Sequence, residues 1–241
     1  MPSSRDRGPS SAGGRRFRLV VTDVDGTLTD RSRRLDVRAL LAVRALEDRG
    51  VPVVLATGNV LPVALALHRT LGLSGPIVAE NGGLLWMGEG SRVERMGDQK
   101  VALAAYRALV RAGLPVRRLF TDRWRESEVA LEPGVSVARL RRALGRRPVL
   151  VESTGYAIHL MEAGVGKLPT LQRALGRLGL SVADAVVLGD GDNDVAMLRA
   201  SGFGVSFPSA SARARAAARY VSRAPYALGF VEGLKASRVL A

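Results

Sequence analysis

The chain has 241 residues, of which 47% are hydrophobic and 24% charged, so it is long enough for one α/β domain or for a core with a smaller second unit. It has no cysteine, which excludes disulfides and thiolate chemistry and fits a cytoplasmic protein, and no apolar run reaches the roughly 18 residues of a membrane span. The formal net charge of +14 comes almost entirely from arginine, which indicates anionic partners or simply reflects genome composition.

The first 16 residues are basic, rich in Ser, Pro and Gly, and poor in large apolar side chains, so we expect residues 1–16 to be disordered. After them, short apolar runs alternate with amphipathic stretches. The pattern predicts strand, helix, strand, helix and strand at residues 18–23, 36–50, 51–57, 62–72 and 76–83. This order favours a parallel sheet with helices on its faces.

The pattern changes over residues 85–161. There it predicts helix, strand, helix and a hairpin of two strands, at residues 99–113, 117–122, 136–145, 148–153 and 156–161. The first pattern then returns, with a helix, a strand, a helix, a strand and a last helix beginning at residues 167, 184, 195, 203 and 226. We therefore expect an α/β core of residues 17–84 and 162–241, split by an inserted α+β unit of residues 85–161.

Polar residues gather at the ends of the predicted core elements, where open α/β sheets bind their ligands. Asp23 and Asp25 follow the first strand in the sequence DVDGT, and carboxylates that close repel unless a cation or a shared proton lies between them. The other segments are Thr57-Gly58-Asn59 after the second strand, Lys167 at the start of a helix, and GDGDND at residues 189–194.

Each segment by itself also has an ordinary structural interpretation, as a helix cap, a turn, a solvated lysine or a polar loop. Two sharper alternatives fail. A calcium loop in GDGDND requires Gly and Glu where the chain has Val195 and Ser201. A P-loop at Lys167 requires Gly and then Ser or Thr where the chain has Met161 and Leu168.

Together the segments predict phosphoryl transfer. They supply two pairs of carboxylates, a hydroxyl with backbone N–H donors, and an ammonium, all at one edge of the predicted sheet. Hard oxygen ligands suit Mg²⁺. A carboxylate can attack phosphorus and form an aspartyl-phosphate, while cations and N–H groups neutralise the phosphate oxygens.

With these segments, the chain resembles the haloacid dehalogenase-type phosphatases, and residues 85–161 lie where that family carries its C2-type caps. The resemblance implies that Asp23 is the nucleophile and a Mg²⁺ ligand. It implies that Asp25 is the general acid and base and binds the metal through its backbone carbonyl, and that Asp190 and Asp194 complete the metal site. It further implies a set of phosphate-binding or substrate-orienting residues: Thr57, Gly58, Asn59, Lys167 and Asn193.

Within that superfamily the chain resembles archaeal phosphoglycolate phosphatases more closely, in the stretches TGNVLPVALALHRTLGLSGPIVAENGG, TDRWRE, YAIHLM and GDGDND. That resemblance implies a Rossmann-like parallel core with a C2-type cap, and Mg²⁺-dependent hydrolysis of 2-phosphoglycolate. Asn59 departs from the wider superfamily, in which many C2 members have Arg. In the cap, Arg123, Arg125 and His159 are candidate substrate contacts, with solvated arginines and a buried core histidine as the alternatives.

Other functions remain open at this point. One is a phosphatase of a sugar phosphate or a phosphoglycerate derivative, and another is a phosphomutase. A nucleic-acid-binding module is disfavoured, because aromatic residues make up only 5% of the chain. The expected partner is a small phosphorylated metabolite rather than a membrane or a nucleic acid, and a homodimer is left open.

Overall fold

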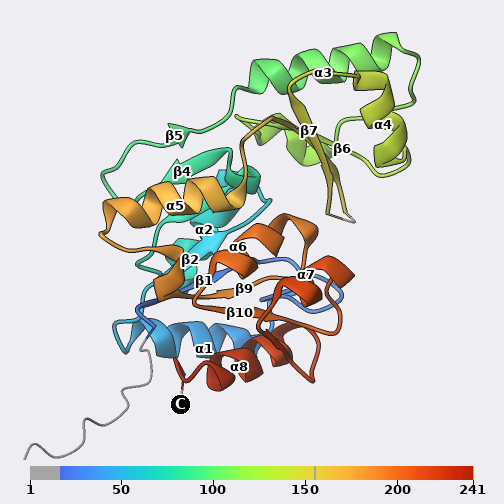
Figure 1. Ribbon diagram of the computed structural model, residues 1–241. Coiled ribbons are helices and arrows are strands. Elements are labelled where there is room, and N and C mark those ends of the chain that lie inside the picture. The colour runs from blue at the N-terminus through green and yellow to red at the C-terminus, as the bar shows by residue number, and fades with distance from the viewer. Residues whose placement is uncertain (1–16, 155, 241) are drawn as a thin grey trace, which may run out of the picture.

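The structure, a computed structural model, describes residues 17–154 and 156–240 (Figure 1). The disorder expected for residues 1–16 lies outside the described residues. The described chain forms two sheets, a large one of mixed direction and a small antiparallel one. In sheet order the strands of the large sheet are β11 (Tyr220–Val221), β10 (Phe203–Ser206), β9 (Ala185–Leu188), β1 (Leu19–Thr22), β2 (Val53–Ala56), β3 (Ile77–Ala79), β4 (Leu84–Trp86) and β5 (Glu94–Arg95).

The strands from β11 to β3 are parallel, whereas β4 and β5 extend the sheet in the antiparallel direction. Strand β1 lies in the middle between β9 and β2, with Thr22 opposite Leu188 of β9 and Leu55 of β2. Because parallel strands end at the same edge of a sheet, the residues that follow β1, β2 and β9 meet there. The predicted α/β class with a parallel core is confirmed.

Helices cover both faces of the large sheet, as Figure 1 shows with α1 and α8 on one side and α5 and α6 on the other. Alternate residues of one strand enter different cores. Val20 packs with α1 and α8, whereas Val21 packs with α5 and α6. These helices are α1 (Val37–Glu47), α2 (Leu61–Leu71), α5 (Lys167–Arg177), α6 (Val195–Ala200), α7 (Ala212–Ala217) and α8 (Tyr226–Ala236).

Local sequence explains where the predicted helices begin and end. Asp36 caps α1, because its carboxylate accepts a hydrogen bond from the backbone N–H of Arg38 at 2.9 Å. Helix α2 ends at Gly72, whose φ of 65° lies in the left-handed region that glycine enters without steric cost. These residues set the start of α1 and the end of α2.

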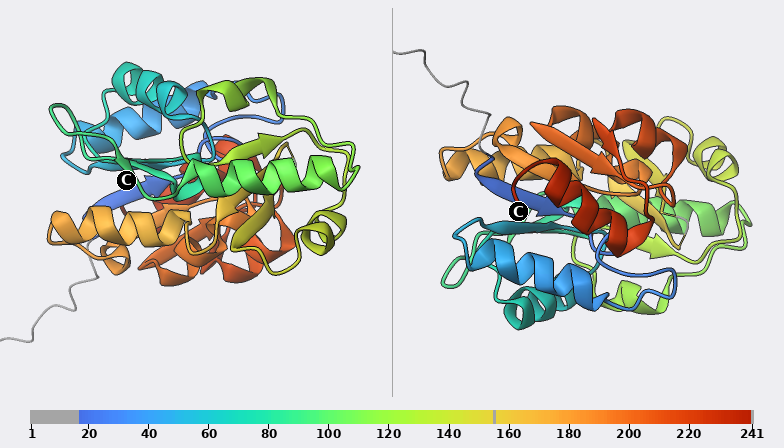
Figure 2. Two further views of the ribbon diagram at one scale, coloured as in Figure 1. Left: turned by 90° about the horizontal axis from the view of Figure 1, so that it is seen from above. Right: turned by 90° about the horizontal axis from the view of Figure 1, so that it is seen from below.

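The small sheet belongs to a separate unit with its own apolar core. Its strands are antiparallel in the order β6, β8, β7, and α3 and α4 pack against them. In both views of Figure 2 this unit projects beyond the large sheet on one side. Its elements are α3 (Gln99–Arg111), the 3₁₀ turn η2 (Phe120–Trp124), β6 (Val129–Leu131), α4 (Val137–Leu144), β7 (Val149–Ser153) and β8 (Ile158–Glu162). We call it the cap.

The strand predicted at residues 117–122 is wrong. Arg118 makes only an isolated bridge to Leu131, and the chain then turns into η2. The buried Asp122 carboxylate accepts hydrogen bonds from the backbone N–H of Ala130, at 2.5 Å, and from Arg118, so it stabilises the turn. The third strand of the small sheet is β6, which the sequence pattern did not predict.

The sheets also bear on the expected start of the inserted unit at residue 85, because the strands just after that point still belong to the large sheet. After β3 the 3₁₀ turn η1 (Glu80–Gly82) reverses the chain, and β4 and β5 then pair with the large sheet. We therefore propose that the core extends to Arg95 and that the cap begins after it. Within the described residues, no helix has the length and apolar character needed to cross a membrane.

Candidate active site

Three carboxylates meet at the edge where β1 and β9 end. Asp23 follows β1 directly, Asp190 lies two residues after β9, and Asp194 is in the 3₁₀ turn η4 (Asp192–Asp194). One carboxylate oxygen from each of them lies within 4.8 Å of the others. Asp23 and Asp194 are buried, and Asp190 is partly buried. The structure thus brings together three residues that the sequence predicts as metal ligands.

A buried ammonium lies between two of these carboxylates. Lys167, the first residue of α5, places its Nζ 2.9 Å from Asp23 Oδ1 and 2.7 Å from Asp194 Oδ1. Burial alone would lower the pKa of Lys167, but the charges of Asp194 and Asp23 raise it above its ordinary value. Lys167 therefore carries a positive charge beside the predicted nucleophile.

The cluster has three carboxylates and only one ammonium, and the pKa values of two of the carboxylates, Asp23 and Asp190, are raised. Burial raises the pKa of Asp23 to about 7, with Lys167 lowering it and Asp194 raising it. Burial, followed by the charges of Asp23 and Asp194, raises the pKa of Asp190 to about 8. Three ionised carboxylates and one ammonium leave two negative charges unbalanced, so the cluster suits a divalent cation.

The backbone around the cluster leaves room for this arrangement. Gly26 has a φ of 77°, and a Cβ atom there would lie 2.1 Å from Asp190 Oδ2. Only glycine fits this position, and it allows the Asp190 carboxylate to lie against the loop that follows β1. Oxygen donors alone form the cluster, which matches the preference of Mg²⁺ rather than of softer metals.

Both carboxylate oxygens of Asp194 accept hydrogen bonds from other groups of the protein. Its Oδ1 accepts from Lys167, and its Oδ2 accepts hydrogen bonds from the backbone N–H groups of Asp190 at 3.1 Å and Gly191 at 2.9 Å. It therefore orients the ammonium and the loop that carries Asp190. Asp192, the remaining carboxylate of GDGDND, is not part of the cluster and accepts hydrogen bonds from the Ser211 hydroxyl and from Arg213.

Asp25 lies outside the acidic cluster, on the wall of an adjoining cavity. Its side chain is exposed, and its Oδ2 accepts a hydrogen bond of 2.7 Å from Asn59 Nδ2. Asn59 also donates to Thr57 Oγ1, from its backbone N–H at 3.1 Å and from Nδ2 at 3.2 Å. Both contacts use the Thr57 hydroxyl as an acceptor; Thr57 itself is buried, and its neighbours Gly58 and Asn59 line the cavity. The two predicted motifs are therefore in direct contact.

The cavity has a volume of about 320 Å³ and lies between the core and the cap. The core wall includes the catalytic candidates Asp23, Asp25, Gly58, Asn59, Asp190 and Asn193. The cap wall includes Arg125 and His159, and two arginines of the core loop after β1, Arg31 and Arg33, also line the cavity. This volume fits a small phosphorylated molecule rather than a polymer.

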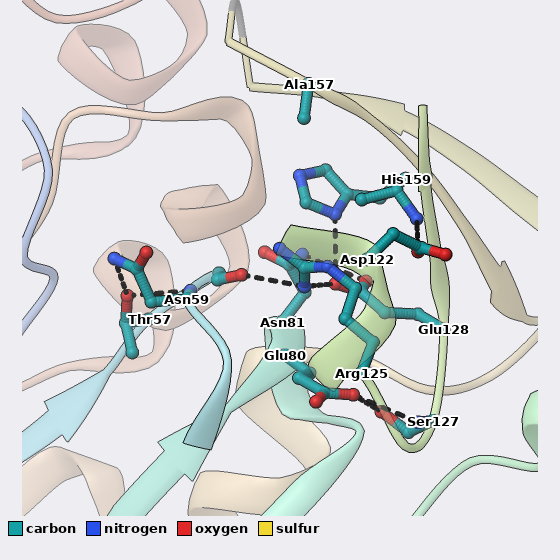
Figure 3. A network of polar contacts seen from close by, with 12 residues as sticks. Thr57, Asn59, Glu80, Asn81, Asp122, Arg125, Ser127, Glu128, Ala157 and His159 are labelled. Atoms are coloured by element: carbon teal, nitrogen blue, oxygen red, sulfur yellow. Dashed lines mark hydrogen bonds and ion pairs between the residues drawn. The ribbon is translucent and has the colours of Figure 1, made fainter. Parts of the chain in front are cut away.

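The three predicted cap contacts separate into two groups, of which Figure 3 shows the first, Arg125 and His159. Arg125 and His159 are buried and line the cavity. Arg123 is exposed and lies outside the cavity lining, with its guanidinium carbon 4.4 Å from the ring centroid of Phe120. Of the two arginines that flank Trp124, the structure thus brings only Arg125 to the site.

Sequence reasoning missed three buried polar residues that join cap and core: Glu80, Asn81 and Glu128. The Glu80 carboxylate accepts hydrogen bonds from the backbone N–H of Ser127 at 3.0 Å and of Glu126 at 3.1 Å. Both Glu80 and Asn81 have positive φ values, of 50° and 55°. Polar residues with positive φ in a turn are typical of a constrained site. The available sequence signal was AENGG, in which two glycines follow Glu80 and Asn81.

Comparisons with known proteins agree with this geometry. The model of a family described as haloacid dehalogenase-like hydrolase matches residues 20–108 and 135–232. Phosphoglycolate phosphatase of Methanothermobacter thermautotrophicus is 38% identical over 219 residues, which cover 91% of this chain and 98% of that protein. Phosphoglycolate phosphatase of Methanoculleus marisnigri is 38% identical over 224 residues, covering 91% of this chain and 96% of that protein.

Solved structures show the same fold. The crystal structure of protein 0175 of Thermoplasma acidophilum superposes with a TM-score of 0.86 at 28% identity, covering 93% of this chain and all of that one. A sugar phosphatase of subclass IIB, BT4131, superposes with a TM-score of 0.77 at 18% identity, covering 93% of this chain and all of that one. At that identity the second likeness concerns the fold alone.

Proposed function

The chain belongs to the haloacid dehalogenase-like hydrolases and is a phosphatase, and from this premise we propose that it hydrolyses 2-phosphoglycolate to glycolate and phosphate with Mg²⁺. The substrate rests on one observation, the 38% identity over 91% of the chain to a phosphoglycolate phosphatase. The small cavity, with an arginine and a histidine opposite the acidic cluster, supports it.

In the proposed reaction, Asp23 is the nucleophile. A bond forms between a carboxylate oxygen of Asp23 and phosphorus, while the bond from phosphorus to the glycolate oxygen breaks, which gives an aspartyl-phosphate. Lys167, 2.9 Å from Asp23 Oδ1, orients the attacking carboxylate and lies close to the incoming phosphate oxygens. Asp23 and Asp190 would hold a Mg²⁺ ion that neutralises charge on the phosphate, and Asp194 would orient Lys167 and the loop that carries Asp190.

Asp25 is the proposed general acid and general base. It gives a proton to the glycolate oxygen as that oxygen leaves, and then takes one from the water that attacks the aspartyl-phosphate. Its position on the cavity wall suits both tasks, and the hydrogen bond from Asn59 fixes its carboxylate. The Thr57 hydroxyl, the Gly58 and Asn59 segment and the Asn193 amide are proposed to hold the phosphate.

The chemistry is tested by two isosteric variants assayed for phosphate release. Asp23→Asn should abolish turnover, because a neutral amide cannot attack phosphorus, and circular dichroism should show an intact fold. Asp25→Asn should lower the rate by roughly 10²- to 10⁴-fold, the range for loss of one general acid and base. From p-nitrophenyl phosphate, whose p-nitrophenolate leaves without needing a proton, the Asp25→Asn protein should still form the intermediate but hydrolyse it slowly, so mass spectrometry of the quenched protein should show one added phosphoryl group.

Two results would contradict the proposal. If Asp23→Asn kept a tenth of the wild-type rate, Asp23 would not be the nucleophile. If the wild type moved the phosphoryl group to a second sugar hydroxyl without releasing phosphate, the chain would be a phosphomutase.

A further inference from the structure

A fully buried carboxylate, that of Glu128, lies at the junction of cap and core (Figure 3). It precedes strand β6 of the cap. Its Oε1 accepts hydrogen bonds from Arg125 Nη1 and from His159 Nδ1, the latter at 3.0 Å, and its Oε2 accepts from Asn81 Nδ2 at 3.1 Å. Glu128 thus holds three side chains from three separate segments.

The environment keeps Glu128 ionised. Burial alone would raise its pKa, but the charges of His159 and Arg125 outweigh burial and hold the pKa of Glu128 below its ordinary value. A buried carboxylate needs such partners, and a buried guanidinium needs a carboxylate in return. The positions of Arg125 and His159 therefore depend on the charge of Glu128.

The same network reaches both phosphate-handling loops of the core. Arg125 Nη1 donates to the backbone carbonyl of Gly58 at 3.0 Å, in the segment that follows β2. Asn81 Oδ1 accepts from Asn193 Nδ2 at 2.9 Å, in the loop that carries the acidic cluster. Asn81 lies in the turn η1 with a φ of 55°, a conformation that a non-glycine residue rarely adopts and that is common at constrained sites. These hydrogen bonds fix the positions of Arg125 and Glu128 of the cap relative to the core.

Arg125 and His159 are the two members of this network that face the cavity from the cap. Among the described residues, the hydrogen bonds from the Arg125 guanidinium to protein oxygens use Nη1. A guanidinium carries further N–H donors and matches a carboxylate in geometry. The part of Arg125 that lines the cavity can therefore donate to an anionic oxygen of a bound ligand.

We infer that Glu128 is a positioning residue for substrate selection: it holds Arg125 and His159 where they receive the carboxylate of the leaving group, in register with the phosphate site. This inference rests on the proposed function and adds to it how the substrate class is recognised. Glu128 itself touches neither the substrate nor the reacting atoms. It acts through the two cavity-lining side chains, and a small displacement of these is enough to lose the match.

The test compares Glu128→Gln, which keeps the shape and removes the charge, with Glu126→Gln. Glu126 lies on the same segment but is exposed and pairs with the exposed Arg95, so it is a matched control for loss of one carboxylate. The readout is the ratio of kcat/KM for 2-phosphoglycolate to kcat/KM for p-nitrophenyl phosphate, which has no carboxylate. A merely structural role would change both substrates together and leave the ratio unaltered.

We expect Glu128→Gln to lower this ratio by roughly 10- to 100-fold, mainly through KM for 2-phosphoglycolate, because misplacement of a positioned group costs up to about 10²-fold. Glu126→Gln should leave the ratio at the wild-type value. Glu128→Asp keeps the charge and should recover part of the ratio. Equal losses on both substrates, an unchanged ratio in Glu128→Gln, or the same change in Glu126→Gln would overturn the inference.

A second variant covers the case in which Glu128→Gln does not fold. Asn81→Gly removes the amide that joins Glu128 to Asn193, and glycine accepts the positive φ at this position. It should lower the same ratio, and an unchanged ratio would overturn the inference. If the wild type prefers another phosphomonoester, the proposed substrate is wrong. Glu128→Gln is then assayed by the ratio of kcat/KM for the preferred compound to kcat/KM for p-nitrophenyl phosphate.

Discussion

Replacing Lys167 with methionine removes the ammonium that lies between Asp23 and Asp194. The side chain of Lys167 is fully buried, and methionine has a similar length without the charge. At the observed 2.9 Å and 2.7 Å, each contact is worth about 6 kcal/mol of gross Coulomb energy at an effective dielectric constant of about 20. Much of this offsets the cost of burying the charges, and breaking one side of a buried ion pair costs about 3–5 kcal/mol net.

We therefore expect Lys167→Met to lower the free energy of unfolding by about 3–5 kcal/mol at pH 8 in EDTA. The loss should be smaller at pH 6, because the carboxylates left without the ammonium take up a proton there. Urea titrations followed by circular dichroism measure both values. Lys100→Met is the matched control, since Lys100 is exposed in the first turn of α3 and its loss should cost under about 0.5 kcal/mol.

The electrostatic reasoning about the site would be refuted by either of two results. One is a loss of less than about 1 kcal/mol in Lys167→Met at pH 8, a value within reach of an ordinary point mutation. The other is an equal loss in Lys100→Met. Either result would mean that the ammonium does not hold the buried carboxylates together.

Three further outcomes can be measured. Arg125→Ala should raise KM for 2-phosphoglycolate by about 10-fold or more, as truncation of a buried charged contact does, whereas Arg123→Ala, outside the cavity, should leave KM unchanged in the same steady-state assay. Folding raises the pKa of Asp23 to about 7 and of Asp190 to about 8, so the metal-free folded state keeps protons that the unfolded chain releases above about pH 4. In EDTA, urea titrations should therefore show the wild type losing stability relative to Asp190→Asn as the pH rises from about 4 to about 8, and a relative gain would contradict these shifts. Phosphate release should require Mg²⁺, stop in EDTA and be poor with Ca²⁺, because Ca²⁺ takes more ligands at longer distances, and full activity after exhaustive chelation would refute the metal site.

The core of the site could be predicted because it depends on short-range signals. Asp23 and Asp190 each follow a run of apolar residues, and parallel strands bring such strand ends to one edge. Lys167 begins a helix that a Gly precedes. The order of these elements along the chain was sufficient to predict a parallel sheet and the meeting of the carboxylates with the ammonium.

The junction between cap and core could not be predicted in this way. Asn81 and Glu128 form a hydrogen bond although 47 positions separate them in the sequence. Glu128 also precedes β6, a strand of three residues that is too short to show a periodic pattern. Contacts of this kind arise only when two units pack together, so no local pattern encodes them.

The choice between Arg123 and Arg125 shows the same limit at shorter range. The two arginines are two positions apart and chemically alike, so only the course of the chain decides which one enters the cavity. The end of the turn η2 places Arg123 outward and brings Arg125 inward to Glu128. The strand that the sequence predicted at residues 117–122 ends before both arginines, so it does not distinguish them.

Phosphate release from a panel of phosphorylated metabolites, measured with the wild type and saturating Mg²⁺, tests the proposed activity without any variant. The panel should include 2-phosphoglycolate, phosphoglycerate, glycerol phosphate and a hexose phosphate. We predict the highest kcat/KM for 2-phosphoglycolate, at least about 10-fold above glycerol phosphate, since a site that binds a substrate carboxylate rejects analogues without one. A preference for the hexose phosphate, or no phosphate release from 2-phosphoglycolate, would contradict the proposal.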